Sequence, residues 1–216
     1  ERKRTEELIR PILRGRDIKR YEYNWANLWL INTHNGIRGK LERIHIENYP
    51  AVKEHLDQYW DKISKRADKG DTPYNLRNCA YLEDFSKPKV MWKIIGCNIN
   101  FSFDETNKVC NNAVDIMTGK RNQLLQFVGL MNSKLFEWYL KLTTEAEVQG
   151  GGIQLYVTTL EKTLLKLDFP NNLNEVTEQR LNGLVSDEDV DKTIYSLYNL
   201  TKEEIDFIHF CKQVNR

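Results

Sequence analysis

The chain has 216 residues, of which 40% are hydrophobic, 29% charged and 11% aromatic, as in a globular protein rather than a disordered one. No apolar run approaches the roughly 18–20 residues that cross a bilayer. Four cysteines without C-x-x-C spacing favour neither a zinc site nor a disulfide framework. We therefore expect a cytoplasmic protein with one main core and reduced, mostly buried cysteines.

The charge is unevenly distributed, although the net charge is only +1. Residues 171–216 hold nine Asp and Glu and five Lys and Arg, a net −4, which leaves +5 for residues 1–170. Within residues 1–170, the stretch "PILRGRDIKRY" (residues 11–21) concentrates positive charge, because four cations lie around Gly15 and Asp17. A near-neutral chain therefore combines a basic body with an acidic tail.

The first third of the chain predicts short helices and strands. Residues 4–13 have a helical pattern that Pro11 should end, and residues 27–33 alternate like a strand. Residues 49–68 predict one amphipathic helix with Pro50 in its first turn. Its apolar face consists of Val52, Leu56, Tyr59 and Ile63.

The middle of the chain predicts a small sheet and the longest helix. Residues 87–96 are typical of a mostly buried strand, and residues 98–107 of a half-exposed strand that ends in a turn. Residues 108–117 return as its expected hairpin partner. A wide apolar stripe then predicts a single helix over residues 121–143.

Gly150–Gly152 predicts a flexible loop, and the alternative is a close backbone approach to a phosphate. A strand over 153–157 and a short helix that ends at Pro170 should follow. Residues 174–211 are helical in pattern. Ser186 is a favourable N-cap, and Thr201 and Glu204 have capping-box spacing.

These elements predict a mixed α/β (α+β) fold, with a small twisted sheet flanked by helices and followed by a helical tail. We expect one mixed α/β body over residues 1–170 and a helical C-terminal tail over residues 171–216.

Motifs for catalysis are missing from the sequence. It contains no G-x-x-x-x-G-K-[ST] phosphate loop and no G-x-S-x-G nucleophile elbow. Its carboxylate pairs fall in turns and at helix starts, where they are usually solvated. We therefore expect no catalytic residue, no metal site and no cofactor in this chain.

Basic residues and asparagines indicate recognition of nucleic acid instead. Arg and Lys neutralise phosphates, whereas Arg to guanine and Asn to adenine are pairings of base readout in the major groove. The residues predicted to contact the DNA backbone are Arg14, Arg16, Lys19 and Arg20. Those predicted to contact bases, in the 74–78 turn and the 98–112 hairpin, are Arg77, Asn78, Asn98, Asn100, Lys108, Asn111 and Asn112. The alternative is that these are surface charges and turn-forming asparagines.

Six segments, taken in order, resemble the TaqI-like C-terminal specificity domain of type IIG restriction–modification enzymes and adenine-specific DNA methyltransferases. The segments are "LRGRDIKRY", "YPAVKEHLDQYWDKISKRADKGDTPYNLR", "KPKVMWKII", "LLQFVGLMNSKLFEWYLK", "LLKLDFP" and "VDKTIYSLYNLTKEEIDFI". Two departures stand out: "KLDFP" replaces the family's "LPIP", and Asn199 replaces a glycine. Asparagine is the next best residue for a left-handed helix cap, so this turn should persist.

The resemblance implies that residues 1–170 are a DNA target-recognition domain. Such a module binds double-stranded DNA, is non-catalytic by itself and is here separated from a methyltransferase half. That half would hold S-adenosylmethionine and an Asn-Pro-Pro-Tyr motif, which this sequence lacks. We expect a fragment of a larger protein of bacterial defence.

Residues 11–21 would hold the DNA backbone where the two halves meet, with Asp17 paired to Arg14, Arg16 or Arg20. The alternative for this stretch is that its cations form salt bridges. The alternative for the whole chain is a docking module for a methyltransferase or nuclease partner.

Overall fold

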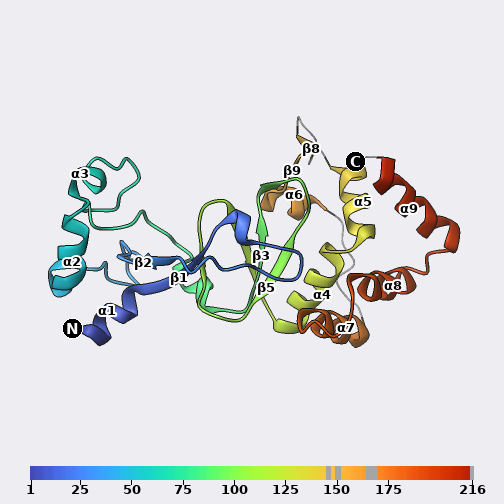
Figure 1. Ribbon diagram of the computed structural model, residues 1–216, viewed down its shortest axis with the longest axis horizontal. Coiled ribbons are helices and arrows are strands. Elements are labelled where there is room, and N and C mark those ends of the chain that lie inside the picture. The colour runs from blue at the N-terminus through green and yellow to red at the C-terminus, as the bar shows by residue number, and fades with distance from the viewer. Residues whose placement is uncertain (145–146, 149–151, 164–169, 215–216) are drawn as a thin grey trace. The chain divides into compact units, whose positions relative to one another are not determined.

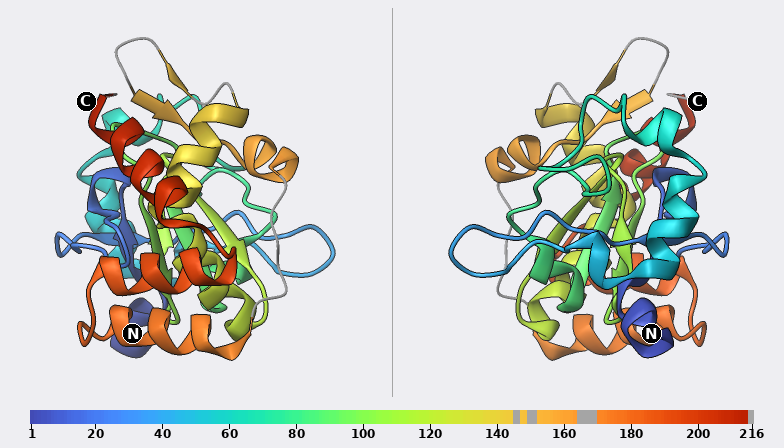
Figure 2. Two further views of the ribbon diagram at one scale, coloured as in Figure 1. Left: turned by 90° about the vertical axis from the view of Figure 1, so that its right-hand side faces the viewer. Right: turned by 90° about the vertical axis from the view of Figure 1, so that its left-hand side faces the viewer.

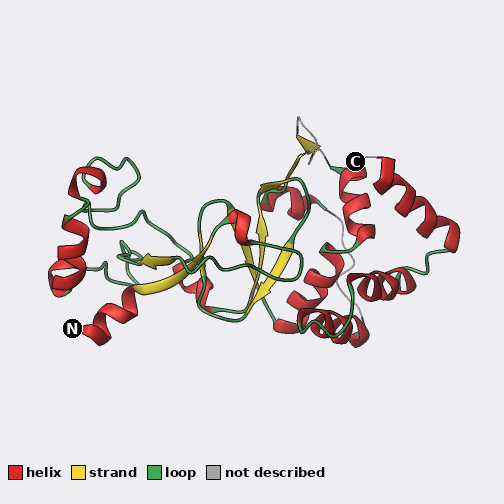
Figure 3. Cartoon of the chain, in the orientation of Figure 1, coloured by secondary structure: helices red, strands yellow, loops and turns green. Residues whose placement is uncertain are grey.

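The structure is a computed structural model that describes residues 1–144, 147–148, 152–163 and 170–214 (Figure 1). Helices and short strands are interspersed before a helical tail (Figure 3), which confirms the expected α+β class. Contacts between residues divide the chain into two compact units. Unit 1 comprises Glu1–Ile12, Asn27–Phe85 and Asn107–Val109, and unit 2 comprises Leu13–Ala26, Ser86–Thr106 and Cys110–Arg216. A domain boundary near residue 170 stays a prediction.

Unit 1 contains the N-terminal helix and most of a three-stranded sheet. Helix α1 (Arg2–Leu8) ends three residues before Pro11, which lies inside strand β1 (Ile9–Leu13). β1 pairs antiparallel with β2 (Trp29–Ile31), where residues 27–33 predicted a strand. With β6 (Val109–Cys110), the sheet order is β2–β1–β6. The 3₁₀ turns η2 (Ile46–Asn48) and η3 (Leu82–Ser86) come later in the chain.

The single helix predicted over residues 49–68 is wrong, because the chain forms α2 (Pro50–Asp57) and then α3 (Trp60–Ile63). Val52 and Leu56 pack with Leu8 and Ile46 in the core of unit 1, whereas Tyr59 is 45% exposed. Helices in proteins are stabilised mainly by packing of their apolar face. The apolar stripe therefore supports a helix only as far as it is buried.

Unit 2 is built around strand β3 (Lys89–Lys93), four of whose five residues are buried. β5 (Phe101–Asp104) and β7 (Val114–Thr118) pair antiparallel with its two edges. The predicted 98–112 hairpin is therefore wrong: β6 (Val109–Cys110) joins the sheet of β1, and β7 pairs with β3. A strand buried on both faces lies at the centre of a sheet and takes two partners, which alternation in one segment does not reveal.

The two faces of β3 contact different parts of unit 2. Val90 and Trp92 lie in a large core with helix residues such as Leu124, whereas Met91 packs with Leu13 and Ile18. Because strand side chains alternate, the segment after β1 covers the face opposite the helices. The basic opening stretch is therefore packed directly onto the sheet.

The helix predicted over residues 121–143 is also wrong as a single element. It is divided into α4 (Arg121–Met131) and α5 (Lys134–Thr143). The Asn132 side chain bonds both backbone groups of Phe101, at 3.0 Å to its nitrogen and 2.8 Å to its oxygen. Ser133 caps α5 by accepting a bond from the Phe136 nitrogen at 3.1 Å. The helix breaks because Asn132 satisfies the edge of β5.

A third sheet has the order β4–β9–β8, with β4 at Ile95–Gly96, β9 at Gly152–Gln154 and β8 at Glu147–Val148. The strand predicted over 153–157 thus starts earlier and is shorter. Helix α6 (Val157–Lys162) follows. Gly150, Gly151 and residues 164–169 of the predicted helix lie outside the described residues.

The tail forms α7 (Asn171–Leu181), α8 (Asp187–Leu197) and α9 (Lys202–Val214). Figure 2 shows α9 beside α5 and α7 beside α8, in agreement with their contacts. Ser186 caps α8, and Thr201 and Glu204 form the predicted reciprocal bonds at the start of α9. Asn199 has φ 51°, the left-handed turn expected of it.

The cysteines are less buried than the sequence predicts. All four are free, Cys97 is exposed, and the other three are half-buried. Cys110 approaches Met91, and burial raises the pKa of its thiol to about 12.

A buried ion pair joins β3 to β5 at the first residue of β3. Lys89 Nζ lies 2.5 Å from Asp104 Oδ2, and both side chains are fully inaccessible to solvent. Asp104 also accepts bonds from the Tyr23 hydroxyl at 3.0 Å and the Thr106 hydroxyl at 2.6 Å. Lys89 donates a further bond to the Thr106 carbonyl at 2.9 Å. Each charge is thus compensated by several partners, as burial requires.

Removing one member of this pair should strongly destabilise the fold. Lys89→Met or Asp104→Asn leaves its buried partner uncompensated, so we expect each to lower the free energy of unfolding by roughly 3–5 kcal/mol. Urea denaturation of the purified chain measures the change. Arg2→Ala is the control, because it breaks the exposed pair with Glu6 and should have a much smaller effect. Equal stability of Lys89→Met and wild type would contradict this prediction.

Candidate nucleic-acid interface

The basic stretch first forms a tight turn, η1 (Gly15–Asp17). The buried Asp17 carboxylate accepts bonds from the Arg14 backbone nitrogen at 2.8 Å, from Nε at 3.0 Å and from Nη2 at 2.8 Å. The hydrogen bond from Arg14 is the main cause that lowers the pKa of Asp17, against the opposing effect of burial. The expected pairing of Asp17 is therefore confirmed for Arg14.

Arg20 and Tyr21 bind the same stretch to the helices of unit 2. Arg20 donates to the Asn132 carbonyl and lies 3.1 Å from Asp187, at the start of α8. Tyr21, at φ 66°, donates its backbone N–H to Phe101 at 2.9 Å. Arg180 lies over the Tyr21 ring at 4.9 Å. Arg14 and Arg20 therefore form salt bridges within the fold, which was the alternative interpretation of this stretch.

Arg16 and Lys19 differ from their neighbours. Both side chains are exposed, and neither forms an ion pair with any described residue. Their charges remain available to a polyanion. Of the four predicted backbone contacts, these two present charge that the fold has not already paired.

A cleft of ≈ 560 Å³ opens beside the η1 turn, and we call it the basic cleft. Among the described residues, its lining includes three cationic side chains and no carboxylate. The lining residues are Arg14, Gly15, Arg16, Lys93, Ile94, Ile95, Asn111, Asn112, Ala113 and Tyr156. The structure thus brings two predicted backbone contacts, Arg14 and Arg16, together with two predicted base contacts, Asn111 and Asn112.

Gly15 allows the two sides of the cleft to approach closely. A Cβ at this position would lie 3.2 Å from Ala113 Cβ and 3.3 Å from the Ala113 carbonyl oxygen. Opposite it, Asn111 is partly a turn former, because its side-chain oxygen accepts a bond from Ala113 N at 3.3 Å. Asn112 is exposed.

The other predicted base contacts are not assembled in this cleft. Asn98 is exposed and Asn100 half-buried in unit 2, outside the cleft lining. Arg77, Asn78 and Lys108 belong to unit 1. The Asn78 side chain accepts a bond from Asn35 at 2.6 Å, which supports the 74–78 turn. A role for these residues in DNA contact stays a prediction.

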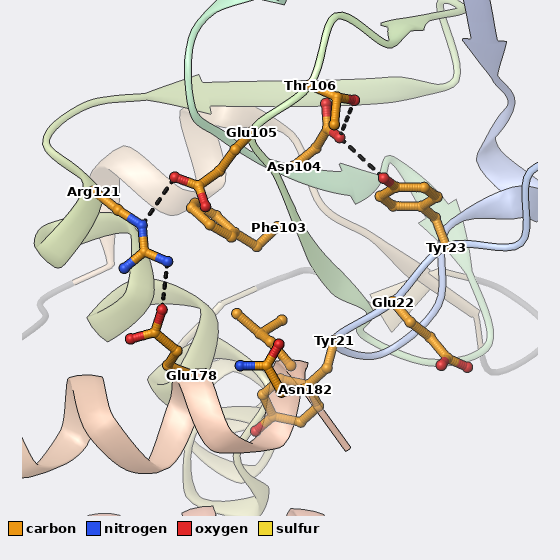
Figure 4. A pocket seen from close by; sticks show the side chains of 11 residues that line it. Tyr21, Glu22, Tyr23, Phe103, Asp104, Glu105, Thr106, Arg121, Glu178 and Asn182 are labelled. Atoms are coloured by element: carbon orange, nitrogen blue, oxygen red, sulfur yellow. Dashed lines mark hydrogen bonds and ion pairs between the residues drawn. The ribbon is translucent and has the colours of Figure 1, made fainter. Parts of the chain in front are cut away.

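A second hollow of unit 2, of ≈ 350 Å³, has the opposite charge and is called the acidic pocket (Figure 4). Arg121 bridges Glu105 at 2.9 Å and Glu178 at 2.6 Å across it. Glu22 and Asp104 also line it. Because Lys89 neutralises Asp104, the uncompensated balance is Glu22, Glu105 and Glu178 against Arg121. This excess of negative charge would repel a phosphate backbone, so the basic cleft is the better candidate for nucleic acid.

Lys93 lines the cleft but was not among the site residues predicted from the sequence. Its position in the cleft follows from the strand period, because Lys89, Met91 and Lys93 share one face of β3. The alternation of Lys89, Met91 and Lys93 could be read from the sequence, but the sequence did not show which segment covers this face of β3.

The described part of the chain contains no cluster of three or more His, Cys, Asp or Glu side chains that could hold a metal ion. Among its helices, none has both the length and the apolar character to cross a membrane.

Residues 10–163 match the family model of the TaqI-like C-terminal specificity domain. Because the match covers more than half of the chain, the chain belongs to this family. Membership supports a role in DNA target recognition in restriction–modification, and suggests a module without catalysis of its own. A comparison with curated proteins found no match.

The different surroundings of Arg20 and Arg16 predict different effects on folding. Arg20→Ala removes the donor to the Asn132 carbonyl and a partner of Asp187, so the free energy of unfolding should fall by roughly 1–3 kcal/mol. Arg16→Ala should leave it nearly unchanged. Arg20→Lys should be intermediate, because one ammonium cannot reproduce the planar guanidinium fork. Denaturant unfolding measures all three; equal losses for Arg16→Ala and Arg20→Ala would contradict the prediction.

Proposed function

We propose that this chain is the sequence-specific DNA target-recognition module of a type IIG-like restriction–modification enzyme or an adenine-N6 DNA methyltransferase. It is non-catalytic by itself. The remainder of the parent protein supplies methyl transfer and binds S-adenosylmethionine, and the parent works in the cytoplasm as part of bacterial defence. The observation that carries the proposal is a cleft whose described lining holds three cations and no carboxylate, in a chain of a specificity-domain family.

The charges of the cleft suit a duplex. Cations that replace condensed counterions along DNA supply most of the sequence-independent affinity. Arg16 and Lys19 have the long, exposed and unpaired side chains that such contacts use, and Arg14 and Arg20 support them from within the fold. Phosphate contacts position the protein, whereas contacts with base edges specify sequence.

The proposed base-contacting residues include two of the cleft lining, Asn111 and Asn112, and others in each unit outside it. Asn112 is exposed beside Arg16 in the cleft lining. An asparagine amide both donates and accepts, which matches the N6 and N7 edge of adenine. Asn98, Asn100 and Asn111 stay in the proposed set from unit 2, and Arg77, Asn78 and Lys108 from unit 1.

A second candidate function is docking to a methyltransferase or nuclease partner. Leu142 on α5 and Phe207 and Phe210 on α9 are 68%, 56% and 61% exposed. Clustered exposed apolar side chains are a feature of protein interfaces. Binding to a protein partner that is insensitive to salt, together with negligible binding to duplex DNA, would favour this function.

Substituting Arg16 should weaken DNA binding without changing sequence preference. We expect Arg16→Ala to lower affinity for all duplexes alike and to flatten the slope of log K against log salt by about one unit. Fluorescence anisotropy with several unrelated duplexes at a series of salt concentrations measures both quantities. Lys192→Ala is the matched control, because it removes one charge from an exposed side chain of α8 outside the cleft. A changed base preference in Arg16→Ala, with the Asn112→Ala variant unaltered, would show that the two roles are reversed.

The chain alone should transfer no methyl group. We expect no incorporation of labelled methyl groups when it is incubated with duplex DNA and S-adenosylmethionine, because the sequence lacks the adenine and cofactor motifs. A commercial adenine methyltransferase is the positive control. Incorporation above background by the purified chain would contradict this part of the proposal.

A further inference from the structure

Two lysines lie on the same face of β3, but only one of them is paired with a carboxylate. Lys89 is fully buried against Asp104, while Lys93, four residues further along the strand, is half-buried and lines the basic cleft. The register partner of Lys93 is Val114, and no described carboxylate forms an ion pair with it. The Lys93 ammonium is therefore a cation that the fold has placed without neutralising.

Two glycines make room for the Lys93 side chain. A Cβ at Gly15 would lie 3.2 Å from Lys93 Cγ. A Cβ at Gly96 would overlap Lys93 Cε and lie 2.6 Å from Nζ. The side chain thus passes close to one glycine near its base and to another near its ammonium. A side chain at Gly15 or at Gly96, in place of the glycine hydrogen, would displace the Lys93 side chain.

We propose that Lys93 is a base-contacting residue whose ammonium donates to a guanine in the major groove; this rests on the proposed function. An ammonium is a donor only, and guanine is the base that presents two acceptors, N7 and O6, on that edge. A specificity contact needs a defined position, and the Lys93 side chain follows a path that Gly15 and Gly96 leave open. Exposed Arg16 lacks such a constraint and suits phosphate.

Gly96→Ala provides a test that removes no charge. The atoms it displaces are at the flexible end of Lys93, so the backbone can remain unchanged while the ammonium moves. Lys93→Met complements it by removing the charge and keeping a long apolar side chain. If both variants lose the preference for the same base, the contact requires the position of the ammonium as well as its charge.

The experiment is a selection by the 216-residue chain from a pool of duplexes with a randomised central region, followed by sequencing. We expect wild type to enrich a motif that contains guanine. Lys93→Met and Gly96→Ala should both lose preference for that guanine by roughly 5- to 150-fold at one base pair and retain the rest of the motif. Gly119→Ala is the matched control, since its Cβ would meet Leu124 at an ordinary 3.6 Å; it should enrich the wild-type motif.

The contrary outcomes are distinct. If Lys93→Met weakens binding to all sequences equally and Gly96→Ala has no effect, Lys93 contacts phosphate and the inference is wrong. An unchanged motif in Gly96→Ala, with Lys93→Met unfolded by circular dichroism, also overturns it. Wild type that enriches no sequence overturns the proposed function, and the role of Lys93 with it.

Discussion

The buried ion pair between Lys89 and Asp104 is the constraint on which the arrangement of unit 2 depends. It aligns β3 with β5 at the register Lys89↔Asp104, and through the Tyr23 hydroxyl it also holds the segment that follows β1. A buried charge tolerates little displacement of its partner, because the desolvation penalty is then uncompensated. The η1 turn, which begins the same segment, is thereby held beside the end of β3, where the basic cleft forms.

Asn132 has a comparable effect on the helices. Its side chain satisfies both backbone groups of Phe101, and its carbonyl accepts from Arg20. Helix α5 starts two residues after Asn132, at Lys134. The Lys134 backbone N–H donates a hydrogen bond of 2.9 Å to the buried carboxylate of Asp191 in the tail. Burial raises the pKa of Asp191, which is the price of placing a carboxylate there. Basic stretch, sheet edge and tail are thus linked by polar contacts around one break in a helix.

Several features could be predicted from sequence because they depend on local chemistry. The helix caps at Ser186 and Thr201 and the left-handed Asn199 were correct, since a side chain bonds its own neighbouring backbone or tolerates a given φ. The helix breaks near Tyr59 and at Asn132 were missed. In both places the apolar stripe continues along the sequence, but burial ends or a distant strand offers a stronger set of bonds.

The amino-acid sequence alone was enough to predict the class of this protein, its basic body and acidic tail, and the residue types suited to DNA. Tertiary structure decided which of those residues carry available charge. Arg14 and Arg20 are adjacent to Arg16 and Lys19 in sequence, yet the first two bond Asp17, Asp187 and Asn132, whereas the latter two remain unpaired within the described chain. Charge is a property of a residue type, but whether it is neutralised depends on partners brought close by folding, more than a hundred residues away in the case of Arg20.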